Sequence, residues 1–206
     1  MRYRKPIFLE KKIPVVVYGG REMRTDHQLD VQGLACPMPI VKTKKTMNTM
    51  EIGETVEVIA TDAGSKADLQ AWAASTGHQY IGLVEEGSVL KHYLRKCNEA
   101  EEREKTFEQT ASLKEVQNIS NDSIVLDVRE EVEYAFGHIK GATSIPFGKL
   151  FDNMEKLDKT KTYYVICRTG TRSDLACQQL AEHGFKHVYN VLPGMTAYTG
   201  ELEKTI

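Results

Sequence analysis

The chain has 206 residues, of which 41% are hydrophobic and 27% charged, and its formal net charge at pH 7 is −2. This composition is typical of one or two globular domains and excludes a disordered chain. No apolar run reaches the ~20 residues of a membrane-spanning helix, and the basic N-terminus lacks a signal-peptide core. We therefore expect a cytoplasmic protein with no membrane partner.

Residues 1–26 fit neither of the units predicted below. Their apolar run "PVVVY" predicts either an added edge strand or part of a disordered extension. The segment is basic, but so short a basic run is more often solvated than bound to a partner, so we do not expect nucleic-acid binding.

Residues 27–97 predict a small α/β unit. Strand patterns lie in "HQLDV" and "ETVEVIATD", helix patterns in "PMPIVKTKKTMNTM" and "SKADLQAWAASTG", and a hairpin in "QYIGLVEEGSVLKHYLR". Ser65 followed by Asp68 predicts a capping box, and Gly77 predicts the end of that helix. The order βαβαββ predicts a two-layer sandwich of helices on a sheet.

Residues 98–109 are densely charged, lack an apolar period and predict a linker. Residues 110–206 predict a second unit, in which "IVLDV", "YYVI" and "HVYNV" are continuous apolar runs. Such runs are typical of parallel strands that are buried on both faces. Helical patterns alternate with them, so we expect a three-layer α/β domain with a parallel sheet.

A cysteine ends the second of these runs, in "YVICRTGTRSD". Cys167 stands at the carboxyl end of a predicted parallel strand, where open α/β sheets bind ligands. The loop after it consists of Arg168, Thr169, Gly170, Thr171 and Arg172. Its backbone N–H groups can surround the sulfur at a helix N-terminus, which favours a thiolate and binds anions. The glycine allows the loop to curl and the arginines add positive charge, so we expect a reactive Cys167 and a substrate-binding loop.

The surrounding sequence resembles the rhodanese family of sulfurtransferases. That family shows D-x-R, an acidic residue and G-H-I-x-G-A-x-x-I-P, which "LDVREEVEYAFGHIKGATSIP" matches. The matching residues are Asp127, Arg129, Glu133, Gly137, His138, Ile139, Gly141, Ala142, Ile145 and Pro146. The resemblance implies that Asp127 holds loop backbone and that Arg129 binds an acidic partner. Near the C-terminus "LPGMTAY" departs from the family's L-x-G-G-x-x-x-W at Pro193 and Tyr198, which leaves the sulfur donor open.

Rhodanese-like folds also include phosphatases and arsenate reductases, whose loops place five residues between cysteine and arginine. Here four residues separate Cys167 from Arg172, the length that this family uses for sulfur transfer. We therefore expect sulfane-sulfur chemistry. A phosphatase or arsenate reductase is a weaker alternative, and a non-catalytic module that binds persulfide for regulation stays open.

A second cysteine stands before a Pro-x-Pro. Pro37 suits the first helical position, so we expect Cys36 at the N-cap, where the helix end favours a thiolate. A Cys-Pro pair alone fits a buried cysteine equally well. The longer stretch "LDVQGLACPMPIVKTKK" resembles the TusA-like (SirA-like) sulfur-carrier family, with L-D-x-x-G-L-x-C-P-x-P-x-x-x-x-K. The matching residues are Leu29, Asp30, Gly33, Leu34, Cys36, Pro37, Pro39 and Lys44.

This second resemblance implies that Cys36 carries sulfur as a persulfide and that Pro37 and Pro39 support its helix. Family members that act in tRNA thiolation commonly have Arg before the cysteine and Glu between the prolines. Ala35 and Met38 stand there instead, which argues against that partnership.

The two resemblances together predict a sulfurtransferase. We expect Cys167 to take sulfane sulfur from thiosulfate or a low-molecular-weight persulfide and to exchange it with Cys36, without a metal or an organic cofactor. A protein donor or acceptor is possible, and the direction of flow, the final acceptor and the oligomeric state stay open. Of the other cysteines, we expect Cys177 in the core and Cys97 exposed at the start of the linker.

Overall fold

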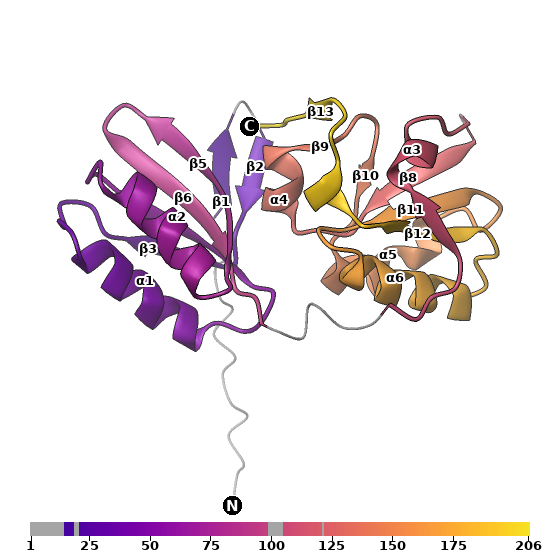
Figure 1. The fold of residues 1–206 in the computed structure, drawn as a ribbon, viewed down its shortest axis with the longest axis horizontal. Helices are drawn as coiled ribbons and strands as arrows, with labels where there is room; N and C mark the ends of the chain where they lie inside the picture. Colours follow the sequence, from indigo (N-terminus) through magenta and orange to yellow (C-terminus); the bar gives the residue numbers. More distant parts are fainter. Residues whose placement is uncertain (1–14, 19–20, 99–104, 121) are drawn as a thin grey trace, which may run out of the picture.

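The computed structural model describes residues 15–18, 21–98, 105–120 and 122–206. Two units, each built on its own sheet, lie side by side, with a small hairpin beside the first (Figure 1). We call the elements from β3 to β6 the first unit and the elements from β7 to β13 the second unit.

The first unit is the predicted βαβαββ sandwich. Its elements are β3 (His27–Asp30), α1 (Met38–Thr49), β4 (Thr55–Ala60), α2 (Ser65–Ser75), β5 (Gln79–Glu86) and β6 (Val89–Arg95). The strand order is β3-β4-β6-β5, in which only β3 and β4 are parallel. Alternate residues of β4, such as Val56 and Val58, point toward Met47 and Leu69 of the helices. Both helices therefore cover one face of the sheet.

The second unit is the predicted three-layer domain. Its strands are β7 (Thr110–Ser112), β8 (Ser123–Asp127), β9 (His138–Ile139), β10 (Thr143–Ser144), β11 (Thr162–Ile166), β12 (Val188–Leu192) and β13 (Leu202–Glu203). Its helices are α3 (Leu113–Val116), α4 (Glu131–Phe136), α5 (Leu150–Asn153) and α6 (Thr171–Glu182), with short 3-10 turns at Phe147–Lys149, Met154–Lys156 and Met195–Ala197.

The main sheet of the second unit is all-parallel, in the order β10-β8-β11-β12-β7, while β9 and β13 form a separate antiparallel pair. Neighbouring residues of β11 face opposite cores. Val165 packs with Leu180 of α6, and Ile166 packs with Val116 of α3. Burial on both faces explains why these strands are continuous apolar runs in the sequence.

One local prediction is wrong, and one alternative that the sequence left open is excluded. Strands β1 (Val15–Tyr18) and β2 (Arg21–Arg24) pair only with each other among the described residues, so Val15–Tyr18 does not add an edge strand to either main sheet. Helix α2 has Gly64 at its N-cap and no capping box. The Ser65 hydroxyl donates instead to the carbonyl of Asp62 and lies 3.0 Å from a ring nitrogen of the buried His92.

The sheet face that α1 and α2 leave open packs against the second unit. Tyr93, Val132 and Ala135 form a buried cluster there, and the rings of Tyr93 and Phe136 lie 5.3 Å apart. A Cβ atom on Gly82 of β5 would lie 2.2 Å from the Phe136 ring, so only glycine fits this close approach. Helix α4 is therefore the contact between the units, and the β1–β2 hairpin lies beside it (Figure 1).

Candidate functional site

Cys167 lies directly after β11 with only 1% of its surface exposed. Its Sγ accepts hydrogen bonds from the backbone N–H of Gly170, at 3.2 Å, and from the hydroxyl of Ser173, at 3.3 Å. Gly170 adopts φ +90 and is the N-cap of α6, which begins at Thr171. The loop therefore curls around the sulfur at a helix N-terminus, the geometry that stabilises a negatively charged sulfur.

A second segment holds the loop backbone from outside. The N–H groups of Met195 and Thr196 donate to the carbonyls of Cys167 and Arg168, at 2.9 and 3.0 Å. A Cβ atom on Gly194, which has φ +94, would lie 2.6 Å from the Arg168 carbonyl oxygen. Gly194 is the glycine that "LPGMTAY" shares with the family's motif, and its lack of a side chain lets this segment approach the loop.

Two buried polar residues near the sulfur escaped the sequence analysis. The Ser173 hydroxyl also lies 2.6 Å from Oδ1 of Asn190, and the amide nitrogen of Asn190 donates to the Gly170 carbonyl at 3.1 Å. Both side chains have no exposed surface. The sequence did contain a signal for Asn190, because an asparagine within the apolar run "HVYNV" indicates a buried polar side chain with a specific partner. This network fixes the loop backbone and the position of the Ser173 hydroxyl, whose single proton is shared between the acceptors Asn190 Oδ1 and Cys167 Sγ.

The guanidinium of Arg172 turns toward α4 and forms a two-pronged ion pair with Glu133, at 2.8 and 3.0 Å. Both groups are deeply buried. Despite its burial, Arg172 has a pKa well above the usual range because Glu133 lies against it, and the arginines around Glu133 hold the pKa of that carboxylate far below its usual value. Most of the positive charge of Arg172 is thus balanced by Glu133, and Arg168, the other loop arginine, is partly exposed.

The same carboxylate reaches the first unit. Gln79 of β5 donates to Oε1 of Glu133 at 3.0 Å, and Nε of Arg95 in β6 lies 3.9 Å from Oε2. Beside it, a cavity of about 300 Å³ lies at the junction of the units. Its lining residues are Asp26, Ile52, Gly53, Glu54, Arg95, Glu130, Phe147, Gly148 and Arg172. Glu133 therefore connects the Cys167 loop with the first unit.

Asp127 and Arg129 bind mainly each other. The Arg129 guanidinium donates to both carboxylate oxygens of Asp127, at 2.6 to 3.0 Å, and to the Gly137 carbonyl at 2.8 Å. Asp127 also accepts from the backbone N–H of Arg129. This buried pair fixes the connection between β8 and α4, which carries Glu133. The hydrogen bonds of Asp127 run to Arg129, whereas the family resemblance implied bonds to the loop backbone.

Cys36 is exposed and lies one residue before the N-cap of α1, which is Pro37. Pro39 is in the first turn and is buried. The expected N-cap position of Cys36 is therefore wrong, and so is the expected preference for a thiolate. A hydrogen bond with Asp68 raises the pKa of the Cys36 thiol, and the charges of Asp68 and Asp62 add to this shift.

The remaining cysteines are both buried. Cys177 packs in the core beside Leu180, as expected, and burial raises its pKa. Cys97 was expected to be exposed, but only 7% of its surface is, and the Arg95 guanidinium donates to its Sγ at 3.4 Å. Its backbone N–H also donates to the ring of His78, so both of these partners lie within the first unit.

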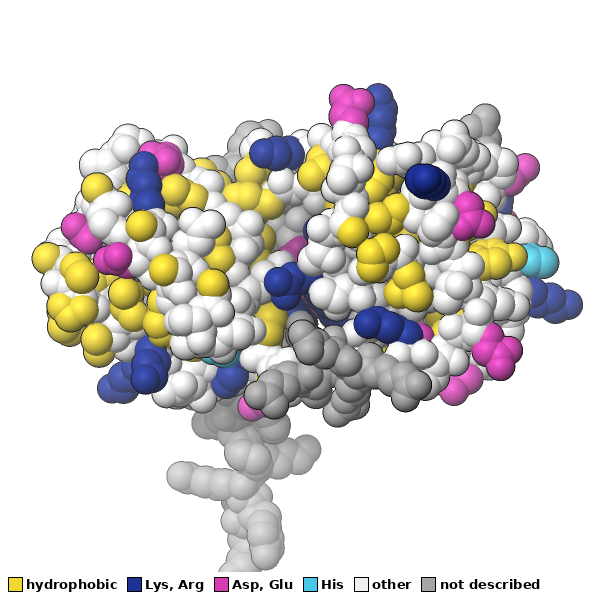
Figure 2. All heavy atoms as spheres, in the orientation of Figure 1, with side chains coloured by type: hydrophobic (Ala, Val, Ile, Leu, Met, Phe, Trp, Pro, Cys, Tyr) yellow, Lys and Arg dark blue, Asp and Glu magenta, His cyan; other side chains and the backbone are white. Residues whose placement is uncertain are grey.

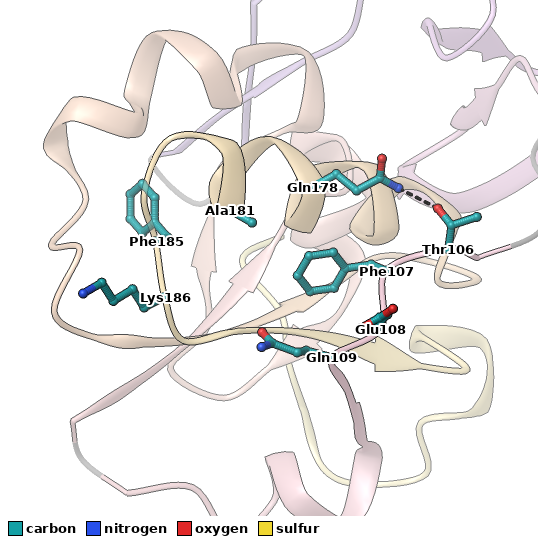
Figure 3. A pocket seen from close by; sticks show the side chains of 8 residues that line it. All are labelled: Thr106, Phe107, Glu108, Gln109, Gln178, Ala181, Phe185 and Lys186. Atoms are coloured by element: carbon teal, nitrogen blue, oxygen red, sulfur yellow. Dashed lines mark hydrogen bonds between the residues drawn. The ribbon is translucent and has the colours of Figure 1, made fainter.

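A larger cavity of about 500 Å³ contains none of the predicted site residues. It lies between residues 106–109 and the outer face of α6, where Gln178 donates to the Thr106 hydroxyl at 3.0 Å (Figure 3). Phe107 anchors this segment, since its N–H donates to Asp174. In the described part of the chain, no cluster of three His, Cys, Asp or Glu side chains could hold a metal ion, and no helix is long and apolar enough to cross a membrane.

The two units have counterparts among known families. The model of the family described as "Sulfurtransferase TusA" matches residues 27–96, and that of the "Rhodanese-like domain" matches residues 110–201. The chain thus combines a sulfur-carrier fold with a rhodanese-like fold.

Similar proteins include one with the same two parts. The "Putative sulfur carrier protein YrkF" of Bacillus subtilis (strain 168) is 45% identical over 189 residues, which cover 88% of this chain and all of that protein. The "Sulfur carrier protein TusA" of Allochromatium vinosum is 44% identical over 71 residues, which cover 34% of this chain and 93% of that protein. A rhodanese-like domain protein from Staphylococcus aureus is 32% identical, with a TM-score of 0.44, over 47% of this chain and 97% of that one.

Like YrkF, the chain belongs to the family of sulfur-carrier proteins in which a TusA part precedes a rhodanese-like part. Membership supports a role in sulfur transfer and implies sulfur donors or acceptors as partners.

Proposed function

We propose that this protein is a rhodanese-type sulfurtransferase in which Cys167 takes sulfane sulfur from thiosulfate or a small persulfide and Cys36 carries it. The observation that carries the proposal is the Cys167 sulfur itself, which accepts from the Gly170 N–H and the Ser173 hydroxyl at the N-terminus of α6. These donors stabilise the thiolate before reaction and the persulfide anion after it. Arg168 to Arg172 supply the binding loop.

The first step is a displacement at sulfur. The Cys167 thiolate attacks the outer sulfur of thiosulfate, a new S–S bond forms, and the bond between the two donor sulfurs breaks. Sulfite leaves with the bonding electron pair, and Cys167 holds the sulfur as a persulfide. No net charge is created, so a preorganised anion site is the main contribution that the protein must make.

The second step transfers the outer sulfur to Cys36. Its thiolate attacks the persulfide, and Cys167 leaves as a thiolate, so no oxidant or reductant is consumed. An exposed thiol at the start of α1, next to Pro37 and Pro39, suits a carrier that must meet different partners. These steps need free thiols, which a reducing compartment such as the cytoplasm maintains.

We divide the chain accordingly into a carrier domain of residues 27–97, a linker of residues 98–109 and a catalytic domain of residues 110–206, preceded by an extension of residues 1–26. Part of the proposed linker lies outside the described residues.

Turnover of thiosulfate tests the proposal. We expect Cys167→Ser to lose at least nine-tenths of the sulfite release, a barrier change of at least ~1.4 kcal/mol. Cys177→Ala, which removes a buried thiol of the same unit, should keep the activity. Loading of one sulfur per chain without turnover would instead identify a persulfide-binding module, and aryl phosphate hydrolysis lost in Cys167→Ser would identify a phosphatase.

A further inference from the structure

Building on the proposed function, we infer that sulfur passes between two copies of this chain, from Cys167 of one copy to Cys36 of another. Three features of the described residues lead to this inference. They are the placement of the two cysteines, the contact that holds the units together, and the charges around each sulfur.

The first unit separates the two cysteines, because Cys36 lies at one end of it and the Cys167 loop lies at the junction beyond its other end. Thr55, at the start of β4, donates its N–H to Asp26, which lines the junction cavity together with Arg172 of the Cys167 loop. Beyond the other end of β4, Thr61 accepts from Gly33, three residues before Cys36. The six residues of β4 span ~20 Å at ~3.3 Å each.

Helix α1 gives the same separation independently. Its twelve residues span ~18 Å at ~1.5 Å each, and they lead from Cys36 back toward Ile52 at the junction cavity. Figure 1 shows α1 along the outer side of the first unit. Transfer requires the two sulfurs to come within bonding reach, ~2 Å in the new bond, so the docked chain cannot transfer sulfur to itself.

The contact between the units favours the docked state. Phe136 lies against Gly82 and Tyr93, and Glu133 binds Gln79 while it pairs with Arg172. Separating the units would expose the apolar cluster and break the hydrogen bond from Gln79. Transfer within one chain would require this separation at every cycle, whereas transfer between copies would not.

The surroundings of the two cysteines are complementary. Asp62 and Asp68 lie beside Cys36, whereas the Cys167 loop carries the partly exposed Arg168 and has Lys105 beside Gly170. Two exposed apolar side chains of α1, Met38 and Val41, add a hydrophobic contact near Cys36. Hydrophobic side chains are visible over this helix in Figure 2. Unlike charges around the two sulfurs would draw the carrier end of one copy to the catalytic loop of another.

The approach of basic residues would also activate the acceptor. The acidic pair keeps the pKa of the Cys36 thiol raised in the free protein. Arg168 and Lys105 of a second copy would offset those charges, and the thiol proton would pass to water. The Cys36 thiolate then attacks the outer sulfur of the Cys167 persulfide, one S–S bond forms as the other breaks, and Cys167 keeps the electron pair.

The test mixes two full-length variants, each of which lacks one of the two cysteines. Full-length Cys36→Ser is loaded with thiosulfate, freed of donor and added to full-length Cys167→Ser, and peptide mapping follows persulfide at Cys36. Transfer between copies predicts that Cys36 of the Cys167→Ser chain acquires sulfur in this mixture. It also predicts an initial rate in the wild-type protein that rises with the square of protein concentration, and a slower rate at high salt.

Other results separate the inference from the function on which it rests. Suppose that Cys36 acquires no sulfur in the mixture and that the rate of Cys36 loading in the wild-type protein is first order in protein concentration. These two results would overturn transfer between copies, but sulfur transfer from Cys167 to Cys36 within one chain would stand. If Cys167 of the wild-type protein acquires sulfur and Cys36 never does, both transfer between copies and the proposed transfer from Cys167 to Cys36 are wrong. Both are also wrong if thiosulfate loads Cys36 of Cys167→Ser as fast as it loads Cys36 of the wild-type protein.

A variant of the contact between the units tests whether sulfur transfer requires the units to separate. Phe136→Ala removes the ring that packs on Gly82 and leaves both cysteine loops untouched. Transfer between copies predicts a rate in the mixture within about twofold of the unmodified pair. Transfer by undocking within one chain predicts that wild-type loading becomes markedly faster with Phe136→Ala, and this outcome would contradict the inference.

Discussion

Replacing Glu133 by glutamine should destabilise the protein strongly, because this carboxylate balances buried positive charge. Its side chain is 1% exposed, and it pairs with Arg172, which is 11% exposed, and approaches Arg95, which is 4% exposed. Glu133→Gln keeps the shape of the side chain and removes the charge. Breaking one partner of a buried ion pair costs about 3–5 kcal/mol, because the remaining charge stays buried without compensation.

A neighbouring position on the same helix provides the control. Glu131 pairs with Lys149 at 2.6 Å, but these side chains are 35% and 55% exposed. Exposed pairs contribute about 0–1 kcal/mol, so Glu131→Gln should change the free energy of unfolding by less than ~1 kcal/mol. The two variants differ in burial and not in the chemistry of the substitution.

Urea unfolding at pH 7 gives the measurement. Far-UV circular dichroism follows the whole chain, and the fluorescence of Trp72, the one tryptophan, follows the first unit. We expect Glu133→Gln to lower the midpoint in both signals, because Glu133 joins the units through Gln79. A loss below ~1 kcal/mol, equal to that of Glu131→Gln, would refute the role of Glu133 as the buried counter-charge of Arg172.

Two further predictions concern the loop and the junction. Ser173→Ala removes the hydroxyl that donates to Cys167, so sulfite release from thiosulfate should slow, whereas Ser120→Ala, at an exposed serine, should leave that rate unchanged. At the junction, burial raises the pKa of Glu130 to about 7, so the folded chain keeps a proton that the unfolded chain releases near pH ~4.5. Stability should therefore fall by at most ~3 kcal/mol as pH rises from ~4.5 through 7, and thermal unfolding of Glu130→Gln should lack this part of the decline.

The sequence predicted both sheets because their burial follows simple patterns. The runs that became β8, β11 and β12 are apolar throughout, as strands buried on both faces must be, and Gly77 ended α2 with φ +72. The Cys167 loop was predicted for a similar reason, since its cysteine, glycine and helix start are adjacent in the sequence, although Asn190 and Met195 also hold its backbone. Local chemistry was sufficient for these features.

The sequence did not predict features that depend on contacts between distant segments. Glu133 matched a family pattern, but nothing in its neighbours indicated that it binds Gln79, 54 residues away. Cys97 was expected to be exposed because a charged segment follows it, yet it is buried and contacts Arg95 and His78, which comes from 19 residues earlier in the chain. The predicted thiolate at Cys36 failed for the same reason, since Asp68 comes from another helix.

That last failure leads to a direct test of the carrier cysteine. If the Asp68 carboxylate raises the pKa of the Cys36 thiol, Asp68→Asn should increase the thiolate fraction and speed alkylation of Cys36 by iodoacetamide at pH 7.5. Asp62→Asn should have a smaller effect in the same direction, because Asp62 acts only through its charge while Asp68 also accepts the thiol hydrogen bond. Peptide mapping separates Cys36 from the buried cysteines. An unchanged or slower rate in Asp68→Asn would contradict the assignment. Cys36 would then be thiolate-rich through its helix, as its position before Pro37 first suggested.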